Sequence, residues 1–193
     1  MNLIINDTDH PLIIKVASIP SSHVAVYFID NDDYFSKRRQ VIEDDGERAV
    51  FFARGVLETI KKMRWTPDII HCQGWMSASV PFYVKTAYAD EPSFAETKVV
   101  TSLFSESQPV ELGEKFAQSI AFRDAKPEML SAYDSRFNHD TLSKLAIDYS
   151  DGVIQASKDV SGALMKYAAD KNVPSLTYTE DFAGAYEEFY EKI

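Results

Sequence analysis

The sequence predicts an α/β protein, a Rossmann-like three-layer domain with a mostly parallel sheet. Short apolar runs of the kind that form buried strands alternate along the chain with longer segments of helical periodicity. Such alternation requires crossover connections, which place helices on both faces of a parallel sheet. With 193 residues, the chain is expected to form a single domain over residues 1–193 that buries a substantial core.

The N-terminal part is predicted to be β structure. Residues 3–5 and 12–16 are expected to pair as a hairpin or edge pair about a turn at 7–11, and a further strand is expected at 24–29. The polar run 30–33 could offer oxygen ligands to a cation. Because the glycine and distal glutamate of a calcium loop are missing, a solvated turn with Asx-type capping is favoured.

Residues 47–64 are predicted to form the first long helix, because apolar side chains recur on one face. Four carboxylates gather at its start, namely Glu43, Asp44, Asp45 and Glu47. Unpaired amides and the helix dipole stabilise carboxylates there, which alone could account for them. The functional alternative is that one carboxylate points over the sheet as a polar contact or base, and sequence position leaves both explanations open.

The candidate centre of function is the stretch 65–76. Its apolar run, 68–72, predicts a buried strand, and polar and aromatic residues follow where open α/β sheets bind their ligands. A histidine such as His71 at a strand end is more often structural than ligand-binding when taken alone. Trp75 could stack on a sugar or cover the core, and Cys72 is expected to be inert packing.

The rest of the chain continues the alternation of strands and helices. Helices are predicted at residues 76–88, 142–149, 159–170 and 182–193, with Ser157 as a helix N-cap, and strands at 98–104, 152–156 and 174–178. Residues 105–135 are expected to form a long loop with one or two short helices, and loops of this length are usually functional or mobile.

Composition excludes several classes of function. The net charge of −10 argues against nucleic acid as the main partner, and no apolar run reaches the roughly 18 residues of a membrane helix. The single cysteine excludes an internal disulfide and a thiolate zinc cage, so a cytoplasmic location is expected. The 7 glycines include no dinucleotide or P-loop fingerprint, and no G-x-S-x-G elbow occurs.

Several motifs, in one order along the chain, resemble those of bacterial glycogen synthases and plant starch synthases. Residues 44–48 and the helix after them resemble the D-N-x-x-R-F segment of that family. Residues 67–81 are similar to its P-D-[VI]-[VI]-H-x-H-D-W-H-x-x-x-x-P motif. Residues 27–35 resemble its V-Y-F-L-D…Y-F element, and 149–157 resemble its A-D-x-V-x-T-V-S segment. The resemblance covers most of residues 24–160.

The resemblance implies a family 5 glycosyltransferase with two Rossmann-like domains in the GT-B arrangement. Such enzymes transfer glucose from ADP-glucose to an α-1,4-glucan with retention of configuration, and they need no metal or other cofactor. This chain would be a large part of the acceptor-side N-terminal domain. It would lack the first strand, with its K-T-G-G donor loop, and the C-terminal domain that binds most of the nucleotide.

By motif, Asp44 falls where the family has a sugar-site aspartate, which makes it the catalytic candidate. Arg48 would be its companion, and Asp45 lies beside it. His71 matches the first histidine of H-x-H-D-W-H, and Trp75 matches the tryptophan. Besides Asp44, the resemblance therefore implies substrate binding by Asp45, Arg48, His71 and Trp75.

The chain departs from the family at three positions of the same motif. Gln73 stands for the second histidine, Gly74 for the aspartate and Met76 for the last histidine. We expect Gln73 and Met76 to remain substrate-binding positions, although a thioether cannot donate the hydrogen bond of an imidazole.

Two hypotheses follow. The first is a glucan synthase domain that is inactive as an isolated chain, because the preorganised charge of the missing donor domain is often the largest catalytic contribution. A separate donor domain or a homo-oligomer would then complete it. The second is a non-catalytic module that binds glucan or nucleotide sugar and acts in regulation, consistent with the three departures.

Overall fold

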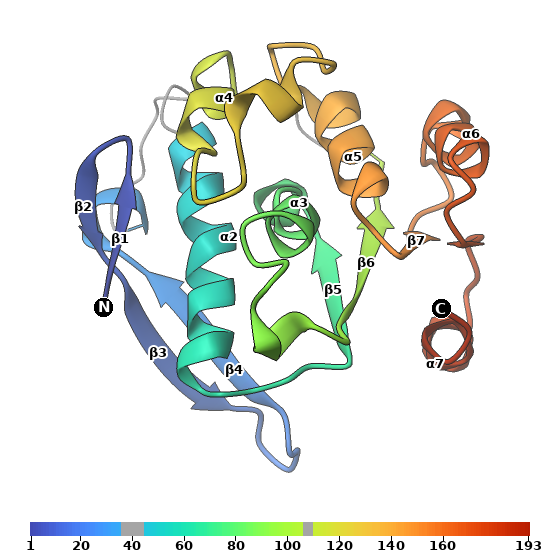
Figure 1. Cartoon of the computed structure of the whole chain (residues 1–193). Helices are drawn as coiled ribbons and strands as arrows, with labels where there is room; N and C mark the ends of the chain where they lie inside the picture. Colours follow the sequence, from blue (N-terminus) through green and yellow to red (C-terminus); the bar gives the residue numbers. More distant parts are fainter. Residues whose placement is uncertain (36–44, 106–109) are drawn as a thin grey trace.

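A computed structural model describes residues 1–35, 45–105 and 110–193 (Figure 1). Its main sheet has four parallel strands in the order β5 (Ile69–Gln73), β6 (Lys98–Leu103), β7 (Gly152–Gln155) and β8 (Ser175–Leu176). Their alternation with helices confirms the predicted α/β class. Within the described residues, β5 pairs only with β6, so it forms one edge of this sheet.

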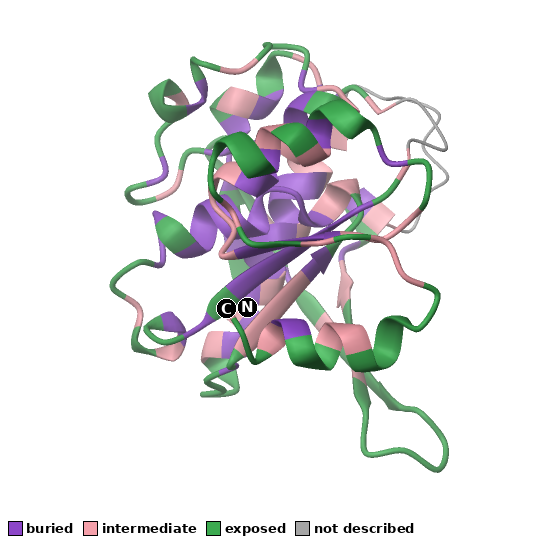
Figure 2. Cartoon of the chain, turned by 90° about the vertical axis from the view of Figure 1, so that its right-hand side faces the viewer, coloured by how far each residue is buried: buried purple, intermediate pink, exposed green. Residues whose placement is uncertain are grey.

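Helices cover both faces of the sheet, which confirms the three-layer arrangement. On one face lie α3 (Val80–Lys85), α5 (His139–Asp148) and α6 (Gly162–Asp170). The other face is covered by α7 (Phe182–Tyr190), whose Phe189 packs against strand residues of β6 and β7. Figure 2 shows the largely buried strands between the upper helices and α7 below them.

The N-terminal strands form two antiparallel hairpins, and the first differs from the prediction. β1 (Asn2–Ile5) pairs with β2 (Thr8–Pro11), so the pairing of residues 3–5 with 12–16 was wrong. The intervening Asn6 and Asp7 have φ of 47° and 59°, and a two-residue loop with two positive φ angles matches the twist of tightly paired strands.

The second hairpin joins β3 (Ile13–Ser18) to β4 (Ala25–Asp30), and its exposed tip projects from the body in both views (Figures 1 and 2). After it, the Asn31 side-chain oxygen accepts hydrogen bonds from the amides of Asp33 and Tyr34, at 2.8 and 3.0 Å, and caps α1 (Asp32–Phe35). The predicted Asx-type capping is thereby confirmed. No cluster of three or more potential metal-binding side chains occurs in the described ranges.

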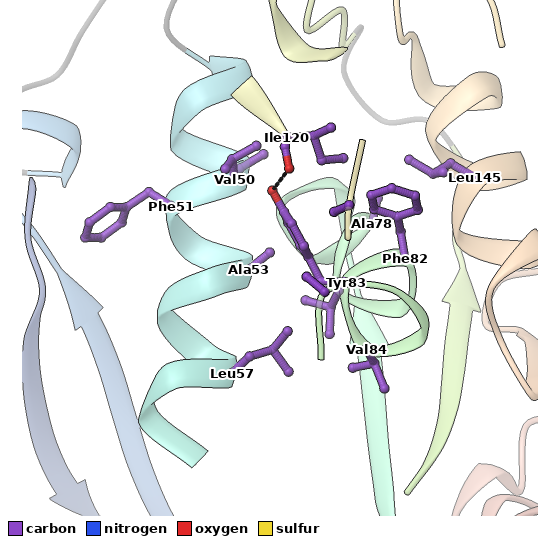
Figure 3. Packing of buried hydrophobic residues seen from close by; sticks show 14 of the residues in the cluster. Val50, Phe51, Ala53, Leu57, Ala78, Phe82, Tyr83, Val84, Ile120 and Leu145 are labelled. Carbon is purple, nitrogen blue, oxygen red and sulfur yellow. Dashed lines mark hydrogen bonds between the residues drawn. The ribbon is translucent and has the colours of Figure 1, made fainter. Parts of the chain in front are cut away.

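Helix α2 (Asp45–Lys62) links the hairpins to the helices above the sheet, as Figure 3 shows from within the core. Its Val50 and Leu57 are fully buried, and it packs against α3. The hydroxyl of Tyr83 on α3 donates a hydrogen bond of 2.9 Å to the backbone oxygen of Ile120. This buried bond joins α3 to the segment after α4 (Lys115–Ser119).

The single helix predicted at 76–88 is divided into a 3₁₀ turn, η2 (Trp75–Ser77), and α3. The prediction was wrong at this point for a local reason. The Ser77 hydroxyl bonds the backbone oxygens of Gln73 and Gly74, both at 2.9 Å, and such side-chain bonds compete with helix formation. Pro81 then fits the first turn of α3, where its missing amide costs least.

The remaining connections contain further short elements. These are the 3₁₀ turns η3 (Pro92–Phe94) and η4 (Pro127–Leu130), besides α4. The predicted N-cap role of Ser157 was wrong, because α6 starts five residues later, with Ser161 at the N-cap. Instead, the Ser157 side-chain oxygen accepts a bond of 2.9 Å from the amide of Ser105 and joins the chain beyond β6 to the chain beyond β7. No helix in the described residues is long and apolar enough to cross a bilayer.

The contact between α7 and the sheet predicts a cost for enlarging Gly152. A Cβ there would lie 3.0 Å from two ring carbons of Phe189. We expect Gly152→Ala to reduce the free energy of unfolding by about 1–3 kcal/mol through overpacking. Gly162→Ala is the control, since a Cβ at that position meets no atom within 4 Å. Urea unfolding measures the free energy of unfolding of wild type and both variants. A Gly152→Ala variant as stable as wild type would contradict the packing of α7 on β7.

Candidate functional site

A cavity of about 580 Å³ opens at the carboxyl ends of β5 and β6. This is the edge at which open α/β sheets bind ligands. Its walls come from the end of β5 with η2, from the end of β6, from α5 and from Val110. The lining residues are Cys72, Gln73, Gly74, Trp75, Ser77, Ala78, Thr101, Ser102, Leu103, Phe104, Ser105, Val110, His139, Leu142, Ser143 and Ala146.

The register of the two strands creates this cavity. Gln73, the last residue of β5, pairs with Ser102, and β6 ends one residue later at Leu103, so the two strands end close to the same level. Gly74 then has φ 77° and ψ 163°, a backbone conformation that is essentially restricted to glycine. A Cβ at Gly74 would meet no atom within 4 Å, so backbone conformation favours glycine here and local space does not require it.

The cavity combines an apolar floor with a few polar groups, as small-molecule sites do. Leu142 and Ala146 supply apolar surface from α5, and Ser143 adds a hydroxyl. The exposed amide of Gln73 makes no side-chain hydrogen bond to another residue in the described ranges, so it can bond a ligand. Burial raises the pKa of the Cys72 thiol to about 12, which makes it unreactive.

His71 lies on the opposite face of the sheet from Cys72, under α7. Its Nε2 is 2.7 Å from the Ser102 hydroxyl, and its Nδ1 is 2.7 Å from the Tyr190 hydroxyl. Both ring nitrogens therefore have protein partners, and burial lowers the pKa of the imidazole. His71 is not among the described residues that line the cavity, and its role in substrate binding stays a prediction.

The other predicted site residues divide into two groups. Gln73 and Trp75 line the cavity, and Trp75 is half-buried against the core. Asp45 and Arg48, at the start of α2, form an ion pair of 3.0 Å, and neither lines the cavity. Met76 is half-buried in η2 and also lies outside the lining.

Asp44, the catalytic candidate, lies outside the described residues. Its near neighbour Glu47 is used within the fold. The Glu47 carboxylate accepts a hydrogen bond of 2.6 Å from the Asn6 side chain and one of 3.3 Å from the Tyr34 hydroxyl. These contacts give Glu47 a structural explanation, but they are bonds to other side chains and not to the helix amides that the sequence suggested.

Sequence reasoning missed the walls contributed by β6 and α5. Phe104 is the last residue of the strand predicted at 98–104 and Ser105 follows it, so the strand-end rule that selected residues 73–76 could have found both. His139 and Ser143 approach from a helix more than 60 positions further along the chain than β5. No spacing in the sequence indicates that contact.

The half-buried position of His71 predicts a pH dependence of stability. Its pKa is lowered in the folded state, so folding favours the neutral imidazole. The free energy of unfolding gains this contribution in full only above the ordinary pKa of 6.5. We expect this stability to be lost as the pH falls below 6.5 through the folded-state pKa. Denaturant unfolding from pH 8 to pH 4 should show a smaller loss in His71→Gln. The control is His23→Gln, which changes an exposed histidine. Identical pH profiles for wild type and His71→Gln would contradict the contribution of His71 to the pH dependence.

The comparisons with known proteins agree with the fold and with the motifs. A family model described as the starch synthase catalytic domain matches residues 3–173. The glycogen synthase of Chlorobium limicola is 29% identical over 174 residues, which cover 82% of this chain and 35% of that protein. The glycogen synthase of Chlorobaculum tepidum is 32% identical over 162 residues, 79% of this chain and 32% of its own. The chain thus spans about a third of the length of these relatives.

A solved structure is similar over nearly the whole chain. The catalytic domain of starch synthase IV from Arabidopsis thaliana, bound to ADP and acarbose, matches with a TM-score of 0.72 and 17% identity. The match covers 91% of this chain and 38% of the other. The fold is therefore that of part of a GT-B glycosyltransferase. With the family match over residues 3–173, the chain belongs to the starch synthase catalytic domain family.

Proposed function

We propose that this chain is the acceptor-side part of a glycogen or starch synthase, and that it binds α-1,4-glucan in the cavity beyond β5 and β6. The observation that carries the proposal is that Gln73 and Trp75, two positions of the family's histidine-tryptophan motif, both line a cavity of about 580 Å³. A cavity of this size lies within the range of small-molecule sites. The Trp75 indole and the Gln73 amide suit the apolar faces and the hydroxyls of a hexose.

Transfer of glucose from ADP-glucose would require more than this chain. Since it spans about a third of its relatives, a donor part on another chain or elsewhere in the protein would supply most of the nucleotide site. In the complete site, Asp44 would act on the sugar, with Asp45, Arg48, His71 and Met76 as further substrate contacts by motif. A cytoplasmic location and assembly with a donor part or a second copy belong to the same proposal.

The competing function is a binding or regulatory module that kept the sheet and lost the chemistry. Gly74 favours the binding or regulatory module. The backbone conformation at this position is essentially restricted to glycine, so the family's aspartate would be strained here. Met76 adds to it, because a thioether donates no hydrogen bond. Calorimetry with ADP-glucose and maltooligosaccharides separates the two functions. Binding that vanishes in Asp44→Ala or His71→Ala supports the synthase, and glucan binding indifferent to both supports the module.

His71→Ala also removes the partner of Tyr190, so a second variant is needed. Tyr190→Phe breaks the 2.7 Å contact between the Tyr190 hydroxyl and Nδ1 but leaves the imidazole in place. If His71 binds sugar directly, Tyr190→Phe should retain most of the affinity that His71→Ala loses. Equal losses in both variants would show that His71 acts by holding α7.

The cavity itself is tested by Gln73→Ala. Removing a hydrogen bond worth about 0.5–1.5 kcal/mol should weaken maltotriose binding roughly three- to tenfold in calorimetry. Gln118→Ala is the matched control, because Gln118 is an exposed glutamine on α4 outside the cavity lining. We expect wild-type affinity for the control. An unchanged affinity in Gln73→Ala would place the glucan elsewhere.

A further inference from the structure

A second cavity, of about 420 Å³, lies at the same edge of the sheet. It is formed where β5, β6 and β7 end, together with the segment after β8 and the start of α7. Four aromatic side chains and two amides are among its lining, namely Phe104, Tyr178, Phe182, Tyr186, Gln73 and Gln155. Tyr178, Phe182 and Tyr186 lie after residue 173, beyond the match to the family model.

The aromatic side chains are held in place and still reach solvent. Phe182 is 61% exposed, and its ring centroid lies 5.9 Å from that of Tyr186 in an edge-on contact. Phe104, at the end of β6, is 40% exposed. The Tyr178 amide donates to the Gln155 side-chain oxygen at 3.4 Å, and Lys158 Nζ lies 5.4 Å from the Tyr178 ring centroid. These contacts place Phe182 against Tyr186 and fix the backbone at Tyr178.

The two cavities share part of their lining. Gln73 and Phe104 line both of them, so the end of β5 and the end of β6 form a shared ridge. An extended ligand in the first cavity can cross this ridge and reach the second. A compact ligand, such as a single hexose, would fill only one.

We propose that the second cavity is a sugar subsite, and that a linear α-glucan lies across the strand ends from the first cavity to the rings of Phe182 and Tyr178. The inference takes its ligand class from the proposed function above. A pyranose has apolar C–H faces that pack on aromatic rings, and hydroxyls at its edge that bond amides such as that of Gln73. The segment after residue 173 thereby makes the chain selective for longer glucans.

The length of the glucan tests this directly. We expect wild-type protein to bind maltoheptaose about three- to tenfold more tightly than maltotriose in calorimetry, because only the longer chain reaches the aromatic rings. Phe182→Ala should remove this difference and leave maltotriose affinity unchanged. Since Phe182 is mostly exposed, the variant is expected to keep the wild-type circular dichroism and Tm.

Phe28→Ala is the matched control, because Phe28 is a 52% exposed phenylalanine on β4, distant from both cavities in sequence and fold. We expect it to retain the preference for maltoheptaose. The second subsite is overturned if Phe182→Ala and Tyr178→Ala keep the full preference for maltoheptaose. It is also overturned if wild type binds both sugars equally well. In both cases the proposed function stands. If wild type binds neither sugar, the proposed function and this inference fall together.

Discussion

The parallel pairing of β5 with β6 is the constraint on which the rest of this structure depends. Five consecutive residue pairs, from Ile69 with Lys98 to Gln73 with Ser102, bring two distant segments to the same level. β5 ends at this level and β6 one residue beyond it, and the first cavity lies between η2 and the residues after β6. A slip of one residue would reverse the face of every side chain in β5, so Cys72 and His71 would exchange sides.

The second face of the sheet depends on α7. Phe189 packs against Val100 and Ile154, and the Tyr190 hydroxyl reaches His71. The same helix starts with Phe182, at the mouth of the second cavity. One short helix therefore covers the apolar face, engages the histidine and builds a wall of the second cavity, although it lies beyond the residues matched by the family model. The helix thus connects the part of the sheet that the family model matches to a surface beyond that match.

Sequence reasoning predicted the strands of the main sheet and most helices, because their apolar periodicity reflects burial. It failed where local hydrogen bonds decide the backbone, as with Ser77, which divides a predicted helix, and the Asn6–Asp7 turn, which re-pairs the first strands. For the site, Gln73 and Trp75 could be predicted because they lie at the end of β5 and just beyond it. The contributions of His139 and Ser143 could not, because only the packing of α5 beside β6 brings them to the cavity.

We have proposed that glucan binds at the carboxyl ends of β5 and β6. The most direct measurement is the change in backbone amide NMR shifts when maltotriose is added to the labelled chain. We expect the largest changes at Gly74, Ser105 and Ser143. Trp65 and Thr97, which precede the opposite ends of the same strands, should change little. Changes concentrated at Trp65 and Thr97, or none in the presence of saturating sugar, would contradict it.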